Sequence, residues 1–260
     1  MNSTLDLFQF AWIGDEVDKL GLHLYTDADF AGCDRTLRST TGVHMAVEGP
    51  CSRFPQTFLY ARQSAMANST PEAETVALHT GLKNVMLPSL DLYDVLLPPG
   101  YQKIIHEDNT AAIQVAVSGK NRTMRWLSRN HGVSVQFLYD KLGRDDRVED
   151  IAVIYTRSEW MSADIYTKNF AARNKWRHAL ELINICREDE VDDVVRKRCL
   201  MFQQMQRDME FHPNNVRKHK ASEATARCYV RAGREGAGFK GCQEAERVLN
   251  AKYRDERPAG

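Results

Sequence analysis

The chain has 260 residues, 43% of them hydrophobic, and its net charge at pH 7 is zero. This length and apolar content suit one domain with extensions or two small domains. A neutral chain has no overall basic field that would indicate nucleic-acid binding, and no apolar run approaches the roughly 20 residues that cross a membrane. The six cysteines form no CxxC pair and no signal peptide is evident, so we expect reduced thiols in a soluble intracellular protein.

Three strands are expected early in the chain, over residues 21–26, 42–48 and, more weakly, 56–63. The pairs Gly49-Pro50 and Phe54-Pro55 are expected to interrupt the chain between them.

A helix is then expected from Pro71 to about Pro88. Ser69 or Thr70 can cap its start, and proline is favoured in the first helical position.

Strands and helices alternate in the second half of the chain. We expect a strand over 102–106, a helix over 109–117, a longer basic helix over 123–142, a strand over 151–155, a helix over 163–170 and an amphipathic helix over 173–185. Together the elements predict an α/β domain with a mixed five-stranded sheet flanked by helices.

The two ends differ from this central domain. Residues 1–20 are interpreted as a lead that would follow a preceding region, 21–186 as the domain and 187–260 as a charged C-terminal extension, partly helical between 189 and 212 and disordered later. Because the extension is poor in aliphatic residues, it is expected to bury little and to be dispensable for the fold.

Four acidic motifs follow one another along the chain, each at the end of a predicted strand or near the start of a predicted helix. They contain Asp27, Glu74, Asp108 and Asp164. Four carboxylates from four elements can converge and hold two divalent cations, an arrangement suited to phosphodiester cleavage.

Two of these acids have an acidic neighbour two residues away. Asp27 and Asp29 point to the same face of an extended chain. Glu74 aligns with an apolar helical stripe expected to face the sheet, whereas Glu72 lies on a wetter face where the helix dipole favours an acid. A carboxylate on the buried stripe needs a charged partner, so Glu74 is favoured as a metal ligand.

The other two acids could also have purely structural roles. Asp108 can cap the helix that follows it, and Glu107 beside it should point to the opposite face. Asp164 can be a surface acid that the helix dipole favours.

The motifs resemble the ribonuclease H domain of Ty1/copia-type retrotransposon polyproteins. The resemblance covers about residues 22–170 and rests on five stretches in order: YTDADFAGCDRTLRSTTG, STPEAETVAL, HEDNTAAI, RNHGVSVQFL and MSADIYTKNF. Asn130 and Gly132 depart from the family pattern around His131. This histidine could orient substrate or fill the helix–sheet interface, and the structural role is favoured. The long C-terminal extension departs from it too.

The resemblance implies a ribonuclease H fold and cleavage of the RNA strand of RNA–DNA hybrids with two Mg²⁺ ions, Mn²⁺ being an alternative. It assigns Asp27 to both ions, Glu74 and Asp108 to one and Asp164 to the other. It also implies the reverse transcriptase of the same element as a partner, in the cytoplasm, within a virus-like particle, or in the nucleus. No polymerase motif is present in this chain.

A basic stretch lies between the third and fourth acidic motifs. Residues 120–144 contain six basic residues and one acid, Asp140. Such a stripe can follow phosphates even in a neutral protein. The residues assigned to nucleic-acid binding are Lys120, Arg122, Arg125 and Arg129.

Two other functions stay open at this point. A transposon relic could keep the fold and the basic stripe as a non-catalytic hybrid-binding or structural module. A related-fold nuclease or integrase-type transferase is the other, and the DADFAG and STPEAE motifs argue against it.

Overall fold

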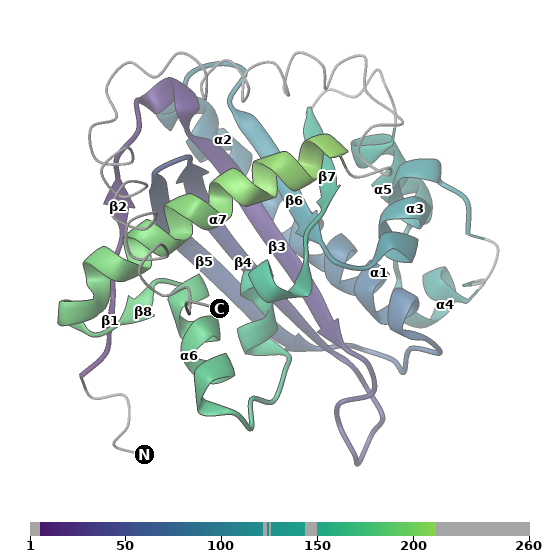
Figure 1. Ribbon diagram of the computed structural model, residues 1–260. Coiled ribbons are helices and arrows are strands. Elements are labelled where there is room, and N and C mark those ends of the chain that lie inside the picture. The colour runs from purple at the N-terminus through teal and green to yellow at the C-terminus, as the bar shows by residue number, and fades with distance from the viewer. Residues whose placement is uncertain (1–5, 122–123, 125, 144–149, 212–260) are drawn as a thin grey trace, which may run out of the picture.

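The computed structural model describes residues 6–121, 124, 126–143 and 150–211. A six-stranded sheet lies at its centre, in the order β2-β5-β4-β3-β6-β7, with helices on both faces (Figure 1). Its strands are β2 (Trp12–Ile13), β3 (Gly21–Asp29), β4 (Thr40–Gly49), β5 (Ser52–Arg62), β6 (Gln102–Glu107) and β7 (Ile151–Tyr155). Strand β3 pairs antiparallel with β4 and parallel with β6. The predicted mixed sheet flanked by helices is confirmed.

The prediction of five strands is wrong, because part of the N-terminal lead joins the sheet. Strand β2 pairs antiparallel with the start of β5. Next to it, the Asp15 carboxylate accepts hydrogen bonds from the Cys51 amide and the Ser52 hydroxyl, both at 2.7 Å. A separate two-stranded sheet joins β1 (Phe8–Gln9) to β8 (Ile185–Cys186). The lead therefore pairs with two segments of the predicted domain that lie far apart in sequence, the start of β5 and β8.

Two prolines interrupt less than the sequence suggests. Strand β5 continues through Pro55, where the register with β4 shifts between Met45 and Ala46. Such irregularities are the places where a strand tolerates proline. The helical segment likewise continues past Pro88, as α1 (Thr70–Gly81), the π-helical turn η2 (Leu82–Met86) and α2 (Leu87–Leu96). The wider π turn accommodates the proline ring and its missing N–H.

The expected basic helix over 123–142 is two short helices, α4 (Leu127–His131) and α5 (Val135–Leu142). Gly132 ends α4 in the left-handed conformation, with φ of 66°, and Ser134 caps α5 by accepting from the Phe137 amide. The remaining helices are α3 (Thr110–Ser118), α6 (Arg173–Leu182), α7 (Val191–Phe211) and the 3-10 helices η1 (Val17–Lys19), η3 (Ser158–Trp160), η4 (Ser162–Tyr166) and η5 (Glu188–Glu190). The helix expected over 163–170 is thus the shorter η4.

One face of the sheet is apolar. Alternate residues of β3 and β4 join one core with side chains of α1, α3 and α5, among them Leu24, Val43 and Leu78. Gly81 lets α1 approach closely, since a Cβ atom there would lie 2.8 Å from Thr26 Cγ2. This close approach fixes how α1 lies against the end of β3.

The opposite face is crossed by α7 (Figure 1). The helix buries side chains including Val194, Cys199, Phe202 and Met205. The Phe202 ring centroid lies 5.9 Å from that of His23 on β3. A helix between 189 and 212 is confirmed, but the expectation that this segment buries little is wrong. Residues 212–260 of the extension lie outside the described residues.

Candidate metal centre

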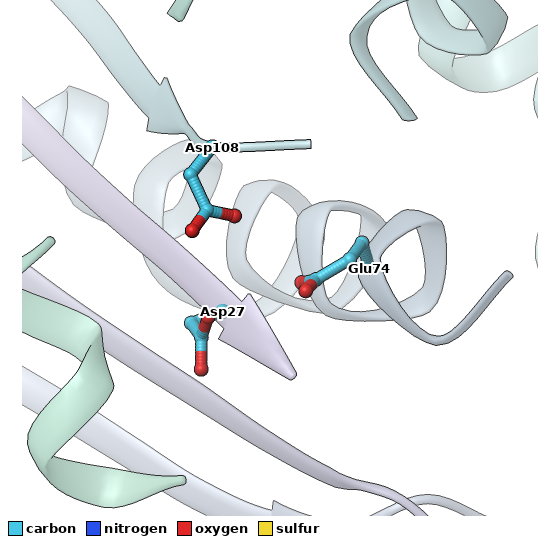
Figure 2. A group of neighbouring side chains, drawn as sticks. All are labelled: Asp27, Glu74 and Asp108. Atoms are coloured by element: carbon cyan, nitrogen blue, oxygen red, sulfur yellow. The ribbon is translucent and has the colours of Figure 1, made fainter. Parts of the chain in front are cut away.

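Three predicted acids meet at one edge of the sheet. Asp27 lies near the end of β3, Glu74 on α1 and Asp108 directly after β6 (Figure 2). One carboxylate oxygen from each lies within 4.8 Å of the other two. The structure therefore brings together three of the four residues within the span of a single ion.

The sheet topology explains this meeting. Strands β3 and β6 are parallel neighbours, so their carboxyl ends reach the same edge and place Asp27 beside Asp108. Helix α1 begins at the Ser69 cap, whose hydroxyl accepts from the Glu72 amide. Glu74 follows in the second turn, on the side of α1 that Gly81 holds close to β3.

The fourth acid, Asp164, approaches from η4 and is connected to the others through a lysine. Lys168 Nζ lies 2.7 Å from Asp164 Oδ2 and 3.5 Å from Asp27 Oδ1. The Thr167 hydroxyl donates to the other oxygen of Asp27. Gly42, opposite Asp27 in the register, lets η4 lie on the sheet, since a Cβ there would be 2.7 Å from Thr167 Cγ2.

The pKa values of Glu74, Asp164 and Asp27 are raised above their ordinary values. Burial raises the pKa of Glu74 to about 11, with further contributions from the charges of Glu107, Asp27 and Asp108. Burial, followed by the charge of Asp27, raises the pKa of Asp164 to about 7, against the opposing effect of Lys168. Burial also raises the pKa of Asp27. The site therefore concentrates more negative charge than the protein neutralises by itself.

The donor atoms fit a divalent cation. Among the described residues, Glu74 Oε2 and Asp164 Oδ1 are buried and have no hydrogen-bond partner. Both residues are at least nine-tenths buried, at 4% and 9% exposure. Hard cations such as Mg²⁺ take carboxylate oxygens as ligands, and an orphaned buried carboxylate oxygen carries a large desolvation cost without one.

The neighbouring acids have structural partners. Asp29 accepts from the Thr40 amide and so closes the β3–β4 connection. Glu72 accepts from the Asn68 amide at 3.0 Å and lies 3.4 Å from the buried His131 ring. The prediction that Glu72 faces water is wrong, because α1 is enclosed on that side as well. Reading His131 as a structural residue agrees with this contact.

Sequence reasoning missed two polar residues that hold the site. Glu107 does alternate away from Asp108, but it is fully buried, accepting from the Thr26 hydroxyl at 2.9 Å and the Asn109 amide at 3.1 Å. Burial raises its pKa well above the usual value. Lys168 was missed too, although its spacing of four residues from Asp164 is the one that places side chains together on a helical turn.

The basic stretch is described only in part. Lys120 and Arg129 are exposed, and the Arg129 guanidinium carbon lies 5.5 Å from the centre of the Trp126 ring. Arg122 and Arg125 lie outside the described residues. The assignment of this stretch to nucleic-acid binding stays a prediction.

No protein-family model matches the chain, and no curated protein matches it. Among solved structures, the chain is similar to LC11 ribonuclease H1, isolated from compost by a metagenomic approach. The identity is 13%, the TM-score is 0.36, and the match covers 67% of this chain and 98% of the other. A likeness of this degree transfers neither residue roles nor an activity. Among the described residues, no helix is long and apolar enough to cross a membrane.

Proposed function

We propose that this protein is a metal-dependent ribonuclease H that hydrolyses the RNA strand of RNA–DNA hybrids. The observation that carries the proposal is the meeting of Asp27, Glu74 and Asp108 within 4.8 Å, with Asp164 adjacent. The order and spacing of the acidic motifs favour interpreting this cluster as a nuclease site rather than as a chance group of acids.

Each acid then has a role that its position supports. Asp27 lies between the other acids, so it would contact both ions, with Glu74 and Asp108 completing one site and Asp164 the other. Bound divalent cations would supply an activated water and stabilisation of the leaving oxygen. The surrounding protein holds the acids in place, through Thr167 on Asp27 and through the Ser158 hydroxyl on Asp108.

The hybrid would be bound mainly through its phosphates. Lys120 and Arg129 are exposed. They are proposed to bind phosphates together with Arg122 and Arg125, which lie outside the described residues. Contacts to the backbone give little sequence preference, and the 2′-hydroxyls distinguish RNA from DNA. The motif resemblance supports an origin in a Ty1/copia-type retrotransposon. A reverse transcriptase of the same element as partner, and a cytoplasmic, particle-associated or nuclear location, belong to the same proposal.

The test compares neighbouring acids on one RNA–DNA hybrid in Mg²⁺. Asp27→Asn should lower the cleavage rate by about a thousandfold or more, because it removes one metal-binding charge at nearly constant volume. Its matched control, Asp29→Asn, removes an acid that only closes a turn. Glu74→Gln should be inactive in the same way, and Glu72→Gln should retain cleavage.

Three results would contradict the proposal in different ways. Sensitivity at Asp29 and Glu72 instead of Asp27 and Glu74 would place the metal ligands two residues away. Hybrid binding without cleavage by the wild-type protein would show a non-catalytic binding module. Cleavage of duplex DNA in preference to the hybrid would show a nuclease of another specificity.

A further inference from the structure

Lys168 occupies a central position among the acids. Its ammonium group lies between Asp164 Oδ2, at 2.7 Å, and Asp27 Oδ1, at 3.5 Å. These are the two residues that the proposed function gives to the second ion. The ammonium group is thus a cation already bound where a divalent cation would be expected.

The local backbone fixes this position. The Lys168 amide donates to the Asp164 carbonyl at 2.9 Å, which closes a turn directly after η4. This turn directs the lysine side chain back over the Asp164 carboxylate. The side chain is still 38% exposed, so it has a route to solvent along which it can leave.

The three-carboxylate cluster is different, since Glu74 Oε2 has no hydrogen-bond partner among the described residues. The lysine contacts Asp27 on the side of Asp164, not Glu74. One part of the centre is therefore open to an ion and the other is already neutralised. Within the part of the chain that the structure describes, Asp164 Oδ1 has no hydrogen-bond partner, which leaves one oxygen for an ion that enters as Lys168 departs.

We propose that the Lys168 ammonium group holds the place of the second divalent cation, so that the protein binds one ion readily and takes up the second only by displacing this lysine. The inference rests on the proposed metal centre and adds an order of loading to it. If the first divalent ion displaces the protons and all four carboxylates are ionised, that ion and the Lys168 ammonium group leave a single negative charge on these groups. A second ion added with the lysine in place would make the centre positive.

The same charge balance connects ion uptake with substrate. A phosphate of the hybrid brings negative charge to the centre and so favours the second ion over the lone ammonium group. The doubly loaded centre would then form mainly when the hybrid is bound. Without substrate, the protein would hold one ion.

The test measures how many Mn²⁺ ions the full chain binds without substrate, and with what affinity. Calorimetry gives the binding, and the paramagnetic resonance signal of free Mn²⁺ gives the amount left unbound. Lys168→Met removes the charge and keeps most of the length. Lys168→Arg keeps the charge. Lys83→Met, at an exposed lysine in η2, is the control for loss of one positive charge elsewhere.

We expect the wild-type protein, the arginine variant and the Lys83 control to bind one ion with high affinity and a second only weakly. Lys168→Met should bind the second ion about tenfold more tightly or better, since a competing unit charge a few ångströms away is gone. Its first affinity should change by less than about threefold. Thermal melting of each variant confirms that the compared proteins are folded.

The outcomes separate this inference from the proposed function. Equal second-ion affinities in the wild-type protein and in a folded Lys168→Met variant would overturn the inference and leave the metal centre standing. A wild-type protein that binds no Mn²⁺, or an Asp27→Asn variant that binds it as the wild type does, would overturn the metal centre and the inference together.

Discussion

The two faces of the sheet are both buried, but they are held in different ways. On the α1 face, aliphatic side chains such as Leu24, Val43 and Leu78 form a continuous apolar core. On the α7 face, the sheet itself contributes buried histidine, tyrosine and charged side chains, among them His23, Tyr25 and Glu48. Arg53 donates to Glu48, to Ser162 Oγ at 2.8 Å and to the Leu182 carbonyl at 2.8 Å.

This difference teaches what each face tolerates. An apolar core tolerates substitutions that keep the volume and shape of the side chain. A buried charged network is destabilised when any one partner is removed. The polar face also depends on segments far apart in the chain, because η4, α6 and α7 supply its partners. The candidate metal centre lies at the edge of the sheet where the two faces meet, with Glu74 coming from one side and Asp164 from the other.

Removal of α7 should have the largest effect on the polar face. A chain that ends at Arg187 loses the buried side chains of α7 and also Arg198, which lies 3.7 Å from Glu48. Four buried apolar side chains at about 1.5–3 kcal/mol each predict a loss of about 6 kcal/mol or more. Urea unfolding measures it. A shortened chain as stable as the full chain would restore the expectation that everything after residue 186 is dispensable.

Limited proteolysis is a second way to measure where the folded core ends. Because α7 is packed on the sheet, the resistant core should extend to about residue 205 or beyond, as mass spectrometry can show. A core that ends between residues 185 and 190 would contradict the packing.

Breaking the charged pair should be the costliest single substitution on this face. Arg53→Met keeps the length of the side chain but leaves Glu48 without its main partner, which predicts a loss of about 3–5 kcal/mol. The matched control on the apolar face, Leu78→Met, should cost less than about 1.5 kcal/mol. Adding Glu48→Gln to Arg53→Met should recover part of the loss. Equal costs for the two single substitutions would show that the two faces do not differ.

Gly42→Ala tests the close contact between β4 and the η4 segment, which carries Asp164 of the metal centre. The added methyl group would meet Thr167 and the Ala163 carbonyl and push η4 away from the sheet. We expect a loss of about 1–3 kcal/mol in stability, typical of overpacking, and a larger loss of cleavage, because Asp164 moves with η4. Normal cleavage by a destabilised variant would show that η4 adapts without displacing the acid.

The two regions should also respond to pH in opposite directions in the metal-free protein. The raised pKa of Glu74, about 11, means that between pH 4.5 and 11 the folded chain keeps a proton that the unfolded chain releases. Stability is therefore lost as pH rises, by at most about 1.4 kcal/mol per pH unit. Melting temperatures in a chelator should show this slope in the wild-type protein and a shallower one in Glu74→Gln.

The buried histidines have the opposite sign. Burial lowers the pKa of His23 to about 4 and holds those of His44 and His106 well below the usual value. As pH falls from about 6.5 towards 4, these histidines bind protons in the unfolded chain but stay neutral in the folded chain. Stability is therefore lost on acidification. Comparing each slope with that of Glu74→Gln separates the two contributions, and an unchanged slope in that variant would contradict the assignment.

The sequence by itself predicted most of the strands and helices and the candidate acids. Apolar stretches separated by glycine and proline pairs predicted the early strands, Ser69 or Thr70 followed by Pro71 predicted the start of α1, and helical periodicity favoured Glu74 over Glu72 as the residue that faces the sheet. These are local rules, so they can be applied to a short window of sequence. The placement of Asp27, Glu74 and Asp108 agrees with them.

Only the tertiary structure decided which polar groups are buried and by what. The sequence predicted that Glu72 faces solvent, yet it lies against His131. It predicted that the segment of α7 is dispensable, yet this helix covers Glu48 and His23. Lys168 next to Asp27 joins residues 141 positions apart. Such partners come from distant segments brought together by the sheet topology, and the free energy of a buried charge depends on those partners rather than on its neighbours in sequence.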